Sequence, residues 1–199
     1  MADFFLGLTG NIAAGKSSIA KDFEALGVPH IDLDAICHDL YASDKSLVQE
    51  IVRYVGPVAD GAGKMDMEKL REIVFSDLRA KAQFEAIVWP EVEEIAFSQA
   101  RQIGGLVVME TPMLYEAGWQ YKFHDIALVY CDDKIRKQRL IDRGFNQSSA
   151  AIVMNSQMNQ DKKMELTKRW GGYIIDNSGD EQARMEQVSK IYESINQIN

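Results

Sequence analysis

Eight residues near the start of the chain, Gly10 to Ser17, constrain the fold more than any other stretch. They match the pattern of a Gly, four free positions and then Gly-Lys-Ser/Thr, which is typical of a phosphate-binding loop. The apolar run 4–9 predicts a buried strand before the loop, and residues 17–26 show helical spacing up to Gly27. Strand, loop and helix in this order favour phosphate binding, because loop amides and a helix N-terminus then surround the anion.

The pattern assigns roles within this loop. We expect Lys16 to reach the β- and γ-phosphates of a nucleotide and the Ser17 hydroxyl to ligate Mg²⁺. The residues expected to hold the nucleotide here are Gly10, Asn11, Ala13, Ala14, Gly15, Lys16, Ser17 and Ser18. The ordinary alternative is a chance match in a loop between a strand and a helix. Nucleotide binding is the premise, and the reaction is the open question.

Length and charge narrow the class of protein. A chain of 199 residues suits one α/β domain with insertions. Its formal net charge of −8 argues against a nucleic-acid partner and makes any cluster of cations informative. No apolar run reaches the ~18 residues of a membrane span, and the N-terminus has no signal-peptide pattern. Cys37 and Cys131 lie far apart, so we expect a reducing, cytoplasmic location and buried, unpaired thiols.

Carboxylates end two of the expected strands. Residues 28–34 read as a strand that carries Asp32 and Asp34 on one side, beside the phosphate loop. One acid there suits a general base toward an acceptor hydroxyl and the other a partner of Mg²⁺. The alternative is that Asp34 caps a helix over 35–41. Glu110 ends the apolar strand 106–110 and is a further candidate near the metal, with a solvent-exposed carboxylate as the alternative.

A long helical stretch separates the second strand from the third. We expect helices over 46–55, over 66–75, and over 79–102 with an interruption or kink at Trp89-Pro90. This is more than one crossover helix requires, which suggests a helical insertion covering the acceptor. Plain scaffolding is the alternative.

The cations gather after the fourth expected strand, 126–131. The basic positions on the following helix are Lys134, Arg136, Lys137, Arg139 and Arg143. Arg136 and Arg139 are three residues apart, and Arg139 and Arg143 four apart, so they share a face, where one or two arginines can hold phosphate bidentately. The alternative is a solvated basic face that nearby aspartates neutralise.

The last part of the chain predicts a helical pair and a fifth strand. Residues 148–158 and 162–169 read as two helices suited to a mobile lid. Residues 172–179 give a strand and a polar turn containing Asn177, which is a candidate neighbour of the adenine or an ordinary loop. A final helix extends to about residue 195.

Taken together, these segments resemble the dephospho-coenzyme A kinase family nearly from end to end. The matching segments are 7–10, 14–17, 31–34, 112–116, Arg139 with Arg143, Gln157, and 175–179. The phosphate loop alone would mark only the P-loop class, whereas the ordered set is much more specific.

The resemblance implies transfer of the ATP γ-phosphate to the ribose 3′-hydroxyl of dephospho-coenzyme A, with Mg²⁺. It also implies an α/β P-loop NTPase fold with a five-stranded parallel sheet flanked by helices, a helical substrate-binding insertion and a lid. By this match Asp34 resembles the general base, Lys16 and Ser17 hold phosphates and metal, and Arg139 or Arg143 resembles the cation at the transferring phosphoryl group. The corresponding metal candidates are Ser17, Asp32 and Glu110.

The expected division assigns 1–56, 106–143 and 170–199 to the nucleotide-binding core, 57–105 to the helical substrate region and 144–169 to the lid. A monomer is favoured, with a small molecule as the partner. The alternatives are another small P-loop kinase, or a weakly catalytic nucleotide-binding regulatory protein.

Three positions depart from the usual family pattern. Asn11 stands where a second Gly is usual, Trp89 where many members carry His, and Val153 where many carry Arg. Because Asn tolerates a left-handed backbone better than most residues, we expect the loop to form with Asn11 in place.

Overall fold

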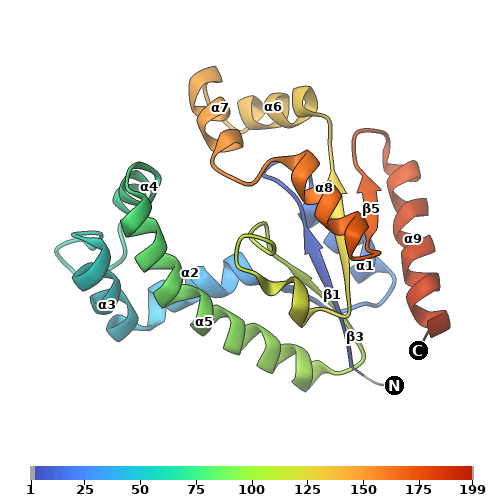
Figure 1. Cartoon of the computed structure of the whole chain (residues 1–199), viewed down its shortest axis with the longest axis horizontal. Helices are drawn as coiled ribbons and strands as arrows, with labels where there is room; N and C mark the ends of the chain where they lie inside the picture. The colour runs from blue at the N-terminus through green and yellow to red at the C-terminus, as the bar shows by residue number, and fades with distance from the viewer. Residues whose placement is uncertain (1–2, 199) are drawn as a thin grey trace. The chain divides into compact units, whose positions relative to one another are not determined.

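The computed structural model describes residues 3–198 of the chain and has an α/β architecture (Figure 1). Its strands are β1 (Phe4–Thr9), β2 (His30–Asp32), β3 (Leu106–Glu110), β4 (Asp125–Tyr130) and β5 (Tyr173–Asp176). Its helices are α1 (Lys16–Ala25), α2 (Leu33–Ser43), α3 (Lys45–Val55), α4 (Met67–Ser76), α5 (Leu78–Ile103), α6 (Asp133–Asp142), α7 (Gln147–Asn155), α8 (Gln160–Arg169) and α9 (Glu181–Ile198), with a 3-10 turn at Trp119–Lys122.

The five strands form one sheet in the order β2-β3-β1-β4-β5. β1 lies in the middle and pairs in parallel with both β3 and β4, so that Gly7 stands beside Met109 on one side and Ile126 on the other. β4 in turn pairs in parallel with β5. The five-stranded parallel sheet expected from the resemblance is confirmed. Its middle strand leads directly into the phosphate-binding loop.

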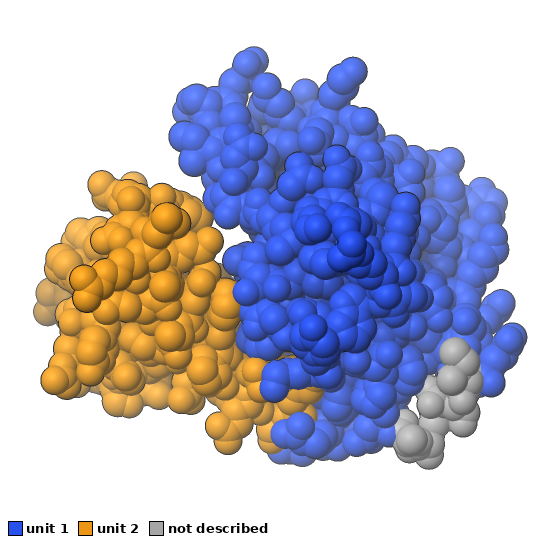
Figure 2. Space-filling view, in the orientation of Figure 1, with its two compact units in different colours: residues 1–31, 100–199 blue, residues 32–99 orange. Residues whose placement is uncertain are grey.

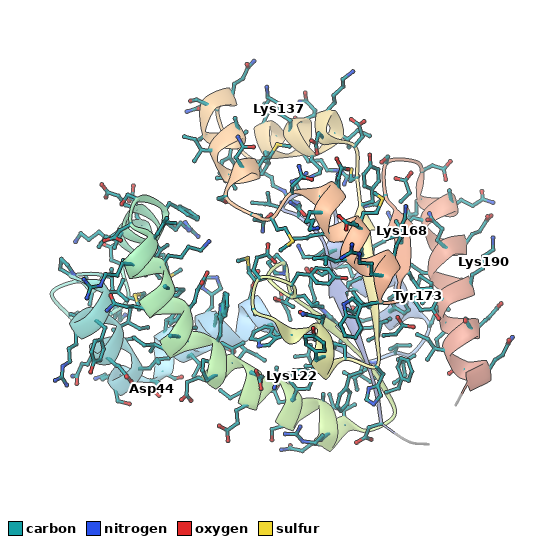
Figure 3. The ribbon with its side chains drawn as sticks, viewed as in Figure 1. Asp44, Lys122, Lys137, Lys168, Tyr173 and Lys190 are labelled. Atoms are coloured by element: carbon teal, nitrogen blue, oxygen red, sulfur yellow. The ribbon has the colours of Figure 1, made fainter. Side chains whose placement is uncertain are left out.

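Alternate side chains of a strand point to the same face of the sheet, so Leu6 and Leu8 of β1 share a face. Leu6 and Leu8 of β1 pack with Phe23 of α1 and Ile191 of α9 in one buried cluster. Figure 1 shows α9 beside β5, and Tyr173 of β5, labelled in Figure 3, lies 3.2 Å from the Ser194 hydroxyl of α9. α8 packs against β4 and β5. These contacts hold α8 and α9 against the sheet.

The chain divides into two compact units, shown in different colours in Figure 2. Residues 1–31 and 100–199 form the first unit, which contains the phosphate-binding loop, and residues 32–99 form the second, helical unit. Within the second unit, Asp44, labelled in Figure 3, caps α3 by accepting hydrogen bonds from the amides of Ser46 and Leu47 at 2.9 and 3.0 Å. The division into core, substrate region and lid stays a prediction.

Two local expectations differ from the structure. β2 ends at Asp32, which caps α2 through the amides of Asp34 and Ala35, so Asp34 lies in the first helical turn and not on a strand. The alternative in which Asp34 itself is the cap is therefore wrong, because Asp32 precedes the helix and takes that role. In the second case, α5 continues through Pro90 as one helix, so the expected interruption is wrong, and the alternative of a kink there stays a prediction.

No helix among the described residues is both long and apolar enough to cross a membrane.

A substitution at Gly7 tests the packing of the middle strand. A Cβ built there would lie 2.7 Å from Leu114 Cδ1 and 2.9 Å from Phe123 Cγ, both in buried side chains. We expect Gly7→Ala to lower the free energy of unfolding by about 1–3 kcal/mol, because overpacking forces neighbouring side chains to move. Urea unfolding followed by circular dichroism measures the loss. The exposed Gly179 has open space around it, so Gly179→Ala is the control and should change stability by less than about 0.5 kcal/mol.

Candidate functional site

The phosphate-binding loop takes a shape that requires glycine at its two ends. Gly10 has φ 152° and Gly15 has φ 95°, and a Cβ at Gly10 would lie 2.6 Å from the Val129 carbonyl oxygen. Gly15 is also the N-cap of α1, where no side chain caps the helix. The first amides of α1 are therefore not taken by a capping side chain, which suits an anion at this position. Ser18 begins the helical turn by donating its amide to Gly15 O at 3.0 Å.

Asn11 does not use the left-handed conformation that we expected it to tolerate. Among the described residues, Ala13, with φ 61°, is the non-glycine position with a positive φ. The Asn11 side chain is buried, at 2% exposed, and its Nδ2 donates to the Met158 carbonyl oxygen at 2.9 Å. The loop is thus tolerant of Asn11 for a different reason, since this residue keeps an ordinary backbone and gains a side-chain partner.

Arg139 and Asn177 brace the outer side of the loop. Arg139 Nη1 donates to the carbonyl oxygens of Ala13 and Ala14, both at 3.1 Å, and Nη2 donates to Asn177 O at 3.1 Å. Asn177 Nδ2 donates to Ala14 O at 2.7 Å. The arginine and the strand-end asparagine, which the sequence associated with the ligand, contact the loop backbone together. Arg143, by contrast, is exposed at the C-cap of α6.

Arg136, one of the basic candidates on this helix, is a further brace of the loop. Its side chain is buried, at 2% exposed, and its Nε donates to Ile12 O at 3.0 Å while Nη1 pairs with Asp133 at 2.7 Å. Its spacing of three residues from Arg139 predicts that both lie on one helix face, and both contact carbonyl oxygens of the loop.

Oxygen ligands suited to a magnesium ion lie next to Lys16. The Ser17 hydroxyl donates to Glu110 Oε1 at 3.3 Å, and Glu110 is 6% exposed. His30 Nε2 lies 3.4 Å from Glu110 Oε2, so this histidine is a neighbour of the candidate metal ligand. Hydroxyl and carboxylate oxygens are the ligands that Mg²⁺ prefers. Among residues 3–198 no group of three or more His, Cys, Asp or Glu is placed to hold a metal.

Asp32 and Asp34 belong to the second compact unit. Asp34 is exposed in the first turn of α2, and one oxygen of Asp32 accepts two amides of that turn. Their roles toward metal and acceptor stay predictions.

A buried ion pair supports the connection between the two expected lid helices. Lys163 of α8 is fully buried, and its Nζ lies 2.9 Å from Glu116 Oε1 and donates to Pro112 O. Burial lowers the pKa of Lys163, and the Glu116 carboxylate opposes that shift. Glu116 Oε1 also accepts the amide of Met158 at 3.0 Å. Sequence reasoning missed this pair because Lys163 stands among exposed positions of a polar helix, although Glu116 belongs to a segment that carries the family resemblance.

A polar cavity of about 370 Å³ lies beside the loop, and its lining includes Asn11, Arg136, Asn155 and Gln157. Asn11 Oδ1 and Arg136 Nη2 are buried there without a hydrogen-bond partner.

The family model and the curated relatives that match this chain carry the same description. Residues 4–183 match the family model described as dephospho-CoA kinase. The chain is 31% identical over 195 residues to a dephospho-CoA kinase of Aquifex aeolicus, covering 96% of each chain, and 36% identical over 180 residues to one of Symbiobacterium thermophilum, covering 87% of this chain and 74% of the relative.

Solved structures share the fold of this chain. A crystal structure from Thermus thermophilus is 26% identical and covers 98% of each chain with a TM-score of 0.85. A dephospho-CoA kinase from Campylobacter jejuni is 20% identical, covers 96% of each chain with a TM-score of 0.60, and supports the fold alone.

Gly15 offers a test of the loop geometry. A Cβ there would lie 2.1 Å from Asn177 Nδ2 in a backbone conformation that L side chains rarely adopt. We expect Gly15→Ala to weaken binding of a nucleoside triphosphate by about tenfold or more, because strain and the clash displace the brace from the loop. Isothermal titration measures the affinity. Gly27 has φ 81° with open space around it, so Gly27→Ala imposes similar strain at the other end of α1 and should leave the affinity unchanged.

Proposed function

Because the chain belongs to the dephospho-CoA kinase family, we propose that it transfers the γ-phosphate of ATP to the ribose 3′-hydroxyl of dephospho-CoA, giving CoA and ADP. The match of residues 4–183 to the family is what supports dephospho-CoA as the acceptor. The complete phosphate-binding loop, which Arg139 and Asn177 hold at the end of the middle strand, is what supports ATP as the donor. Conversion of dephospho-CoA is the activity that the names of the relatives indicate for this family.

The loop and its cations account for the phosphate end of the reaction. Lys16, first residue of α1, would contact the β- and γ-phosphates together with the loop amides. Arg139 lies against the loop and Arg143 one helical turn further along, so both are candidates to stabilise the charge on the transferring phosphoryl group. Phosphoryl transfer depends mainly on such positioning and charge neutralisation.

Magnesium would be held by the Ser17 hydroxyl, with Glu110 and Asp32 as the carboxylates that contact the ion or its waters. The supporting geometry is the Ser17–Glu110 contact of 3.3 Å. When bound, the ion would neutralise charge on the β- and γ-phosphates. Glu110 Oε1 accepts from the Ser17 hydroxyl and so orients it, and His30 Nε2 lies 3.4 Å from the other oxygen of Glu110.

Asp34 is the proposed general base. Its carboxylate would accept the proton of the ribose 3′-hydroxyl as the phosphoryl group is transferred. Its exposure in the first turn of α2 leaves it accessible to a substrate.

We propose a single chain as the active unit, because the loop, its braces and Glu110 all come from one chain. A cytoplasmic location is supported by the state of the two cysteines, which are both free among the described residues.

An ADP-release assay with ATP and Mg²⁺ tests the function. We expect release that depends on dephospho-CoA, and none with adenosine monophosphate or shikimate as rival acceptors. Chelation of Mg²⁺ with EDTA should abolish it, because the phosphate charge is then not neutralised. Release with a rival acceptor would support a different small P-loop kinase, and ATP binding without any release would support a regulatory protein.

Replacement of Asp34 tests its role as base. We expect Asp34→Asn to lower kcat by about 10²–10⁴-fold, since this is the usual contribution of a general base. The affinity for ATP, measured by titration, should stay within about threefold of the original. Asp39 is an exposed aspartate of the same helix, so Asp39→Asn serves as the control and should leave kcat unchanged. An equal kcat in both variants would remove Asp34 from the mechanism.

A further inference from the structure

Two adjacent loop residues are joined to two adjacent residues of the segment between α7 and α8. We call that segment, residues 156–159, the connector. Asn11 Nδ2 donates to Met158 O at 2.9 Å, and the amide of Ile12 donates to Gln157 Oε1 at 2.7 Å. A two-point attachment fixes orientation as well as distance, so the connector and the first half of the loop behave as one piece.

The connector is also held from the opposite side. The amide of Met158 donates to Glu116 Oε1, whose carboxylate pairs with the buried Lys163. Lys163 in turn donates to Pro112 O, in the segment that follows β3. Met158 therefore lies between the loop on its carbonyl side and the Glu116–Lys163 pair on its amide side.

The two helices joined by the connector differ in their anchoring. α8 begins at Gln160, whose side chain both accepts from and donates to the Cys131 backbone, at 3.2 and 3.0 Å, and so fixes that helix to the end of β4. α7 packs mainly against α6. Ala150 of α7 shares a small buried cluster with Ala13 of the loop. A displacement of α7 would therefore also shift the loop and the connector.

We propose that Asn11 is a positioning residue that couples the phosphate-binding loop to the connector, so that ATP at the loop holds the connector in place. Its side-chain amide links the loop to the connector, and the orientation of that amide is fixed because only Nδ2 can donate to the Met158 carbonyl. Asn11 does not have to contact the phosphates in this role. The inference rests on the proposed function only in taking ATP as the loop's ligand.

The test compares Asn11→Ala with Asn155→Ala, in which the replaced residue is an exposed asparagine lining the same cavity. Loss of one buried hydrogen bond is expected to weaken binding of a non-hydrolysable ATP analogue about three- to tenfold in Asn11→Ala. Asn155→Ala should bind like the original protein. In the kinase assay the KM for ATP should rise by the same factor, while the KM for dephospho-CoA stays unchanged.

Hydrogen exchange supplies a readout that a merely structural role would not move. In the original protein the ATP analogue should slow amide exchange both at the loop and at residues 156–159. In Asn11→Ala with saturating analogue, we expect protection of the loop to persist and protection of the connector to be lost. Equal protection of the connector in both proteins would overturn the proposal, as would unchanged affinity of the variant.

A second variant approaches the same coupling from Lys163. Lys163→Arg keeps a cation beside Glu116 and should retain the ATP-dependent protection of the connector, whereas Lys163→Met should lose it. If Lys163→Met does not fold, the comparison of Asn11→Ala with Asn155→Ala decides alone. Because analogue binding needs no acceptor, a protein that binds ATP but does not phosphorylate dephospho-CoA would refute the proposed function and leave this inference intact.

Discussion

The carbonyl oxygens of the phosphate-binding loop are satisfied by side chains from elsewhere in the chain, and the rest of the site depends on this. Arg136 holds Ile12 O, Arg139 holds Ala13 O and Ala14 O, and Asn177 adds a second bond to Ala14 O. A backbone that turns this tightly cannot pair its own polar groups as a helix or strand does, and buried unpaired groups are costly. With the carbonyl side of the loop satisfied, the loop can keep the shape in which its amides face a ligand.

The same arrangement explains why an acidic protein carries a basic helix. Against a formal net charge of −8, α6 concentrates its arginines beside the loop. Two of these arginines donate hydrogen bonds to loop carbonyls, so some of their N–H groups are already occupied without a nucleotide. Their second effect is electrostatic, because cations close to the loop favour an anionic ligand in a site that the whole protein's charge would otherwise repel.

The sequence was sufficient for the loop, the parallel sheet and the family, because these depend on local pattern and order. Gly10 and Gly15 are needed wherever such a loop forms, and the apolar strands 4–9 and 106–110 are buried on both faces. The turn from β2 into α2 was misplaced by two residues, since either Asp32 or Asp34 could have capped the helix and only the tertiary path decides between them. The burial of Arg136 and Lys163 could not be predicted from local pattern, because it depends on partners more than forty residues away, such as Ile12 and Glu116. The roles of Asp32 and Asp34 in catalysis stay predictions.

The position of β1 in the middle of the sheet has a consequence for the order of assembly. The first strand of the chain pairs with β3 and β4, which begin at residues 106 and 125, and the loop that follows it is braced from residues 136, 139 and 177. Contacts this distant in sequence form slowly, because long stretches of chain must be closed before they are gained. During synthesis, the phosphate-binding loop emerges before the strands and side chains that give it its binding geometry. Nucleotide binding therefore requires that the first compact unit has folded as far as β5.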